Sequence, residues 1–123
     1  MSAVKNDQPN VIVPLLQRGF DVNTTDADGN TLLMIAVSEG STNAVDELLA
    51  GGANVHARNQ YGETALMLAA IGGRVEVARA LLGRGAQVDH AGWTPLMYAA
   101  TNGHVNTARL LIAYGAQVNA RAD

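Results

Sequence analysis

The chain has 123 residues, a net charge of −3 and no cysteine, which excludes disulfides, thiolate metal sites and thiol nucleophiles. The negative charge disfavours a nucleic-acid partner, because phosphates favour a basic surface, and no apolar run is long enough to span a membrane. Hydrophobic residues make up 48% of the chain and aromatic residues only 4%, so we expect one domain with a core of leucine, valine and alanine between thin helices.

The chain begins, over about residues 1–25, with a segment that predicts the end of one helix and a second helix over about 10–18. Pro14 lies near the start of this second helix, where a missing N–H costs less than in mid-helix. Either the earlier helix is short, or an export segment or upstream domain has been removed. The apolar residues that define the second helix are Val11, Ile12, Leu15 and Leu16.

The next segment, residues 26–58, opens with the polar turn Asp26–Asn30. This turn is similar to the start of a calcium-binding loop, but Val37 stands where such a loop needs a bidentate glutamate. A turn stabilised by aspartate, glycine and asparagine is therefore the better interpretation. Further along, the pair Leu48–Leu49 is expected to be buried.

Residues 59–89 contain two short predicted helices separated by Gly72 and Gly73. Thr64 precedes the first helix, and its hydroxyl can accept an N–H of the first turn. Gly85 ends the second helix with a residue that tolerates left-handed dihedrals. Each helix has about two turns, so neither would be stable alone. The apolar residues that define them are Leu66, Leu68, Ala69 and Ala70, and then Val75, Ala78, Leu81 and Leu82.

The last segment, residues 90–123, begins with a shortened turn. Fewer residues separate Gly85 from Gly92 than separate Gly52 from Gly62, the corresponding pair of glycines earlier in the chain. Either this turn is naturally short or residues are missing from the sequence.

The same residue types recur at a regular interval through these segments. Thr31, Thr64 and Thr94 follow one another at nearly equal steps, and a column of glycines keeps the same steps. Such a recurrence, in units of about 20–45 residues, marks a repeat protein, in which each unit buries its open face on the next. The predicted repeats lie at about 1–25 (partial), 26–58, 59–89 and 90–123 of a single domain. The glycines of the column are Gly19, Gly52, Gly85 and Gly115.

The most distinctive block reads Gly92-Trp93-Thr94-Pro95-Leu96-Met97-Tyr98-Ala99-Ala100, followed by Asn102-Gly103-His104. In this block Thr94 can cap a helix, and Pro95 takes the first helical position, where no N–H is needed. The block resembles the Gly-x-Thr-Pro-Leu-His-x-Ala-Ala and x-Gly-His pattern of the ankyrin-repeat family, and matching residues run from about residue 3 to residue 120. The resemblance implies an all-α fold, a solenoid of stacked antiparallel helix pairs with turn or hairpin fingers.

The sequence departs from the family pattern in one column. Met34, Met67 and Met97 occupy the place of a histidine that commonly hydrogen-bonds between neighbouring turns in the family. Methionine cannot donate that bond but fills irregular gaps, so we interpret the three as core residues. The substitution raises the question of how neighbouring turns are tied together.

No catalytic or metal site is predicted. His56, His90 and His104 lie in three different repeats, and His104 matches the family's Gly-His, where the histidine is structural. Zinc needs three or four converging ligands, and no His-x-x-x-His or carboxylate–histidine pair is present. The nucleophile-elbow motif and a dinucleotide-binding glycine loop are also missing. We therefore expect no cofactor and no enzymatic activity.

The family resemblance implies that a partner is recognised by the turn tips and by the concave face of the first helices. Tyr61 and Trp93 stand on successive turns and belong to the residue types that dominate binding energy at interfaces, so we predict them as anchors. The alternative for Trp93 is that it folds back over adjacent turns. The predicted partner-binding residues are Asp28, Asn30, Glu39, Gln60, Tyr61, Glu63, Ile71, Trp93, Thr101 and Asn102.

The resemblance thus implies a non-enzymatic module that binds another protein. A narrower alternative is an inhibitor or self-protection protein that caps the active site of a partner enzyme. Acidic side chains outnumber basic ones between residues 21 and 63, which favours a basic patch on the partner and faster association. We expect a monomer in the cytoplasm by default, or an exported or periplasmic protein if an N-terminal signal was removed.

Overall fold

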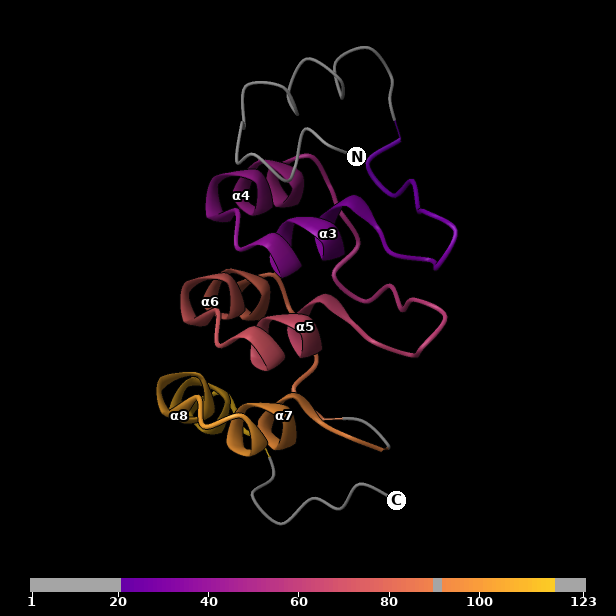
Figure 1. Ribbon diagram of the computed structural model, residues 1–123. Coiled ribbons are helices and arrows are strands. Elements are labelled where there is room, and N and C mark those ends of the chain that lie inside the picture. The colour runs from indigo at the N-terminus through magenta and orange to yellow at the C-terminus, as the bar shows by residue number, and fades with distance from the viewer. Residues whose placement is uncertain (1–20, 90–91, 117–123) are drawn as a thin grey trace. The chain divides into compact units, whose positions relative to one another are not determined.

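The computed structural model describes residues 21–89 and 92–116. Within these residues the fold is all-α, as predicted, with three pairs of short helices and an isolated bridge between Thr25 and Thr31 in place of any strand (Figure 1). The pairs are α3 (Leu32–Glu39) with α4 (Thr42–Ala50), α5 (Ala65–Gly72) with α6 (Val75–Gly83), and α7 (Pro95–Thr101) with α8 (Val105–Ala113). The predicted helix over about 10–18 and the shortened turn at residues 90–91 lie outside the described part of the chain.

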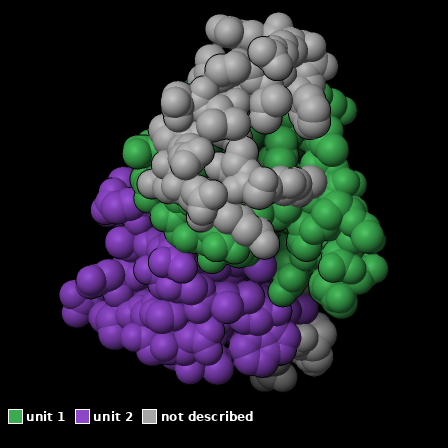
Figure 2. All heavy atoms as spheres, turned by 45° about the horizontal axis from the view of Figure 1, so that its top comes forward, with its two compact units in different colours: residues 1–65 green, residues 66–123 purple. Residues whose placement is uncertain are grey.

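The chain divides into two compact units, residues 1–65 and residues 66–123 (Figure 2). Unit 1 contains α3 and α4, which pack on each other, and two polar loops. We call residues 21–30 finger 1 and residues 54–63 finger 2. Unit 2 contains α7 and α8, which also form a packed pair, and α6, which packs on α8.

Threonine hydroxyls start two of the helices. Thr31 Oγ1 accepts the N–H of Met34 at 3.1 Å, and Thr94 Oγ1 accepts the N–H of Met97 at 3.3 Å. Pro95 occupies the first turn of α7, where its missing N–H is no loss. Each hydroxyl satisfies one of the N–H groups that a helix start leaves without an intrahelical partner, which confirms the capping role predicted for Thr94.

The leucine pairs form the core of both units, as predicted. Leu48, Leu49, Leu81 and Leu82 are at most 6% exposed. In α8, Leu111 is fully buried but its neighbour Ile112 is 47% exposed, because no described helix follows α8. The same residue pair is therefore either core or surface, depending on whether another helix covers it.

The methionine column is buried in two of its three copies. Met34 and Met67 are buried, which confirms their interpretation as core residues, whereas Met97 is only half-buried. Met97 lies in the last described helix pair, so no described helix pair covers it from the C-terminal side. For this residue the prediction of a core position was only partly right.

Glu47 on α4 provides a test of electrostatics in unit 1. Its Oε2 is shielded from solvent and has no hydrogen-bond partner in the described residues. Burial raises the pKa of this carboxyl, because the charged form loses hydration. Because the pKa of Glu47 is higher in the folded state, ionisation of this carboxyl lowers the free energy of unfolding. This loss of stability is absent at acidic pH and develops as pH rises through the ordinary carboxyl pKa.

Glu47→Gln is therefore expected to raise the Tm by a few degrees at pH 7 and to leave it nearly unchanged at pH 3. Thermal unfolding followed by circular dichroism at both pH values measures the effect. Asp46→Asn, on the exposed side of the same helix, is the matched control and should show no such gain. An equal shift at both pH values would count against the burial of a charged Glu47.

Candidate functional site

Finger 1 is organised by the carboxylate of Asp26. Its Oδ1 accepts the backbone N–H groups of Asp28 at 3.0 Å and Asn30 at 2.9 Å. These bonds, with the one from the Asn30 backbone as the largest cause, hold the pKa of the Asp26 carboxyl below its usual range. The resulting tight turn places Asp28 in an exposed position at its tip.

Finger 2 is built in the same way around Asn59, which holds the place of Asp26 in the next repeat. The buried Asn59 side chain accepts, through Oδ1, the N–H groups of Tyr61 at 2.9 Å and Glu63 at 3.0 Å. Tyr61 projects from this turn and is 69% exposed. The organising role of this column was not predicted; its sequence signal is a short side-chain acceptor at the same place in two repeats.

Side chains tie the two fingers of unit 1 together. Gln60 donates twice to Asp28, from its backbone N–H to the Asp28 carbonyl and from Nε2 to the carboxylate, both at 2.9 Å. Asn59 Nδ2 donates to Asn30 Oδ1 and to Glu63 Oε1, also at 2.9 Å. Neighbouring turns are thus joined in unit 1 without the family's histidine.

Four of the predicted site residues therefore share one hydrogen-bonded network in unit 1. They are Asp28, Asn30, Gln60 and Glu63. Glu39 is exposed at the last position of α3, and no hydrogen bond joins it to this network in the described residues. Tyr61 is held at the network's edge through its backbone only.

The close approach of the two fingers makes a glycine necessary at position 29. A Cβ on Gly29 would lie 3.2 Å from the backbone nitrogen of Gln60, the atom that donates to Asp28. Gly29→Ala is expected to destabilise the protein by about 1–3 kcal/mol more than Gly62→Ala, because the second backbone has to shift. Gly62 has a similar positive φ but open space around its Cα, so it controls for backbone strain. Urea unfolding of both variants measures the difference, and equal losses would argue against a rigid contact between the fingers.

Unit 2 contains a hollow of about 330 Å³ next to α7. Two aromatic rings border it: Trp93 and Tyr98, with centroids 5.3 Å apart and planes tilted by 36°. The lining residues are Ile71, Trp93, Tyr98, Thr101 and Asn102. Four of these five were predicted as partner-binding residues, so the fold of unit 2 brings this part of the predicted site together.

Tyr98 is the lining residue that sequence reasoning missed. It directly follows Met97, in the column that holds Ile35 and Leu68 in the earlier repeats, and all three side chains are half-buried. An aromatic residue in a column otherwise aliphatic was the available signal. Its meaning depended on Trp93 being within contact distance, which the sequence does not show.

Trp93 contacts a second aromatic ring within unit 2. Its ring rests on Tyr98 of its own repeat and remains 43% exposed. The contact with Tyr98 restricts the indole while part of its surface stays open to a partner. Such rigid aromatic contacts have a low entropy cost on binding.

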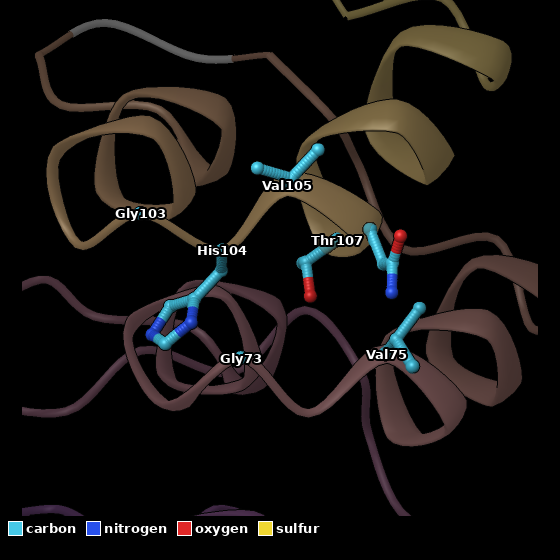
Figure 3. Close-up of a pocket in the computed structure, with 7 residues that line it drawn as sticks. Gly73, Val75, Gly103, His104, Val105 and Thr107 are labelled. Atoms are coloured by element: carbon cyan, nitrogen blue, oxygen red, sulfur yellow. The ribbon is translucent and has the colours of Figure 1, made fainter.

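The loop that closes α7 fixes one side of the hollow. Asn102 Nδ2 and His104 Nε2 donate to the same carbonyl oxygen, that of Ile71, at 3.1 and 3.0 Å. Figure 3 shows the ring of His104 lying against Gly73 in the preceding loop. His104 is thus a structural residue, as predicted, and its ring nitrogen is already engaged.

A second hollow of about 340 Å³ is lined in part by this histidine (Figure 3). Its other lining residues are Gly73, Val75, Gly103, Val105, Asn106 and Thr107. This hollow has no ionisable side chain apart from His104, so it offers no pair of groups for acid–base chemistry.

The described residues also bear on metal binding and on membrane insertion. Over residues 21–89 and 92–116, no three or more histidine, aspartate or glutamate side chains converge as a metal site requires. None of the helices in this part of the chain is long and apolar enough to cross a membrane.

Comparison with known protein families gives a match to ankyrin repeats, in three copies, over residues 1–91 and 43–122. The matched residues cover nearly the whole chain. No match is found among curated proteins.

Proposed function

Because this chain belongs to the ankyrin-repeat family, we propose that it is a non-enzymatic module that binds another protein through its finger tips and first helices. The observation that carries the proposal is the hollow in unit 2, where Trp93 and Tyr98 present partly exposed rings beside Thr101 and Asn102. Aromatic residues that lie beside a hollow with polar neighbours are typical anchors of protein interfaces.

The fingers of unit 1 support the same proposal independently. Their hydrogen bonds hold the side chain of Asp28 and the backbone of Tyr61 in one arrangement before any partner arrives. A preorganised surface loses less conformational entropy on binding than a mobile loop does. Tyr61, the most exposed of the large hydrophobic residues in the described part of the chain, is the anchor we propose for this unit, with Asp28, Asn30, Gln60 and Glu63 around it and Glu39 at the end of α3.

The proposal extends to the organisation of the chain. We propose that the repeats, at about 1–25, 26–58, 59–89 and 90–123, act as one monomeric domain in the cytoplasm. If the partner is an enzyme that this chain inhibits, the protein belongs to the narrower class of inhibitors or self-protection proteins.

Trp93→Ala is expected to weaken partner binding by about 2 kcal/mol or more, a loss of about 30-fold in affinity. The immobilised protein and its variants would be used to capture the partner from a lysate of the source organism, and calorimetry with the purified partner would give the affinities. Binding is expected to weaken because the variant lacks the exposed surface of the indole. Assaying any captured enzyme with and without this chain tests the inhibitor alternative.

Arg79→Ala is the control, because its exposed side chain lies on α6, away from the lining of the hollow. It should capture the partner normally. Circular dichroism must show that Trp93→Ala remains folded, since the ring contact with Tyr98 is worth only about 0.5–1.5 kcal/mol. If Trp93→Ala binds as the parent protein does, the contact surface lies elsewhere.

A further inference from the structure

The hollow in unit 2 has a lining that selects among possible occupants. None of its five lining residues carries a formal charge. The faces of aromatic rings are electron-rich, so Trp93 and Tyr98 repel an anion and attract a cation. An acidic side chain of the partner would lose its hydration here without gaining a positive neighbour. Among the other occupants, a cationic and an aliphatic side chain differ most in how they meet the polar edge of the hollow.

Polar atoms at the edge of the hollow separate these two. Asn102 Nδ2 donates to Ile71 at 3.1 Å, which fixes the orientation of the amide and leaves Oδ1 as an acceptor. Neither Asn102 Oδ1 nor the Thr101 hydroxyl has a hydrogen-bond partner in the described residues. An aliphatic occupant would cover these acceptors without replacing the hydrogen bonds they make to water, which is unfavourable.

Arginine satisfies both sets of groups. Its guanidinium is planar, stacks on aromatic faces and carries five N–H donors, and it is more weakly hydrated than the ammonium of lysine. Its methylene stem can pack on Ile71 while its donors reach Thr101 and Asn102. We infer that this hollow receives an arginine side chain of the partner protein; the inference rests on the proposed function and names the chemistry of its anchor.

The lining of the hollow, and not the charge of unit 2, carries this assignment. The net charge of −3 belongs to the whole chain, whereas residues 66–123 contain five arginines and three acidic residues. Arg79 and Arg109 lie on the second helices α6 and α8, whereas the hollow is lined from α7, the end of α5 and Trp93. The Arg74 side chain lies beside Gly72, the residue after Ile71, so Arg74→Gln, which removes a repelling positive charge, is expected to strengthen arginine binding.

The test uses three short peptides, acetyl-Gly-X-Gly-amide with X as arginine, citrulline or norleucine. Citrulline has the shape of arginine without its charge, and norleucine has only the aliphatic stem. Trp93 is the only tryptophan, so its fluorescence and its indole N–H resonance report the hollow directly. We expect saturable binding of the arginine peptide, with affinity about fivefold or more above either comparison peptide, as a cation–aromatic contact predicts.

Variants of the protein sharpen the test. Tyr98→Leu should weaken binding of the arginine peptide. Tyr114→Leu removes an exposed ring from the end of α8 and should leave the binding of this peptide unchanged. Thr101→Val removes one acceptor from the exposed end of α7 and does not depend on the ring pair. This variant should weaken binding of the arginine peptide and strengthen binding of the norleucine peptide.

Equal or tighter binding of citrulline or norleucine would overturn the inference, as would no saturable response to the arginine peptide. Either result leaves the proposed function standing, because capture of the partner by the parent protein and its loss in Trp93→Ala are measured separately. Conversely, a partner captured equally well by Trp93→Ala would refute the proposed anchor even if the arginine peptide binds.

Discussion

Leu81→Ala is expected to lower the free energy of unfolding by about 2–5 kcal/mol, through lost burial and the cavity that remains. Leu81 is fully buried on α6, and α6 packs on α8 within the same unit. The stability of a repeat protein is a sum over few units and their interfaces, and the total for a small protein is only about 5–15 kcal/mol. Urea unfolding monitored by circular dichroism measures the loss.

Arg79→Ala provides the control on the same helix. Its side chain is 56% exposed, and its ion pair with Glu76, at 3.6 Å, is also exposed. Exposed pairs contribute about 0–1 kcal/mol, so this variant should unfold close to the parent protein. An unchanged midpoint for Leu81→Ala would contradict the burial of this column.

Gly73→Ala is expected to be the most damaging glycine substitution in unit 2. Gly73 has a φ of +66°, and a Cβ there would lie 2.5 Å from His104 Nδ1. The ring would have to move and would break its hydrogen bond to Ile71. The expected cost combines about 1–2 kcal/mol for the left-handed backbone with about 1–3 kcal/mol for overpacking.

Gly103→Ala separates the two contributions. Gly103 has a φ of +73°, but a Cβ there meets nothing within 4 Å. It should therefore lose only the backbone part. The double variant Gly73→Ala/His104→Ala should lose less than the sum of its single variants, because removing the ring removes the clash. Additive losses in chemical unfolding would show that His104 is not what makes alanine unfavourable at position 73.

Local features of the chain could be predicted because each depends on neighbours close by in the sequence. Thr94 caps α7 through the N–H of Met97, within the first turn of the helix, and Gly85 ends a helix through its own backbone dihedral. Repetition strengthened each of these predictions, because the same residue type returned at the same place in the next repeat. The burial of Leu48 and Leu81 followed from the same column pattern.

The candidate site could be predicted only as separate residues. Glu63 and Gln60 were expected at the turn of finger 2, and the structure adds that they belong to one network through Asn59 and Asp28. These partners include side chains from successive repeats, whose rotamers decide whether they bond. The repeat period of the sequence does not determine the rotamers of these side chains.

The amino-acid sequence by itself determined the family, the helix pairs, the threonine cap of α7 and the leucine columns, because capping and hydrophobic periodicity act over short stretches of chain and recur from repeat to repeat. Only the tertiary structure decided how the fingers of unit 1 are joined without a histidine, why Gly73 must be a glycine, and that Tyr98 completes the hollow beside Trp93. In each of these cases the deciding contact joins atoms whose distance depends on side-chain rotamers and on the packing of neighbouring elements. The same physics left Ile112 exposed and Leu82 buried, although both residues occupy one column.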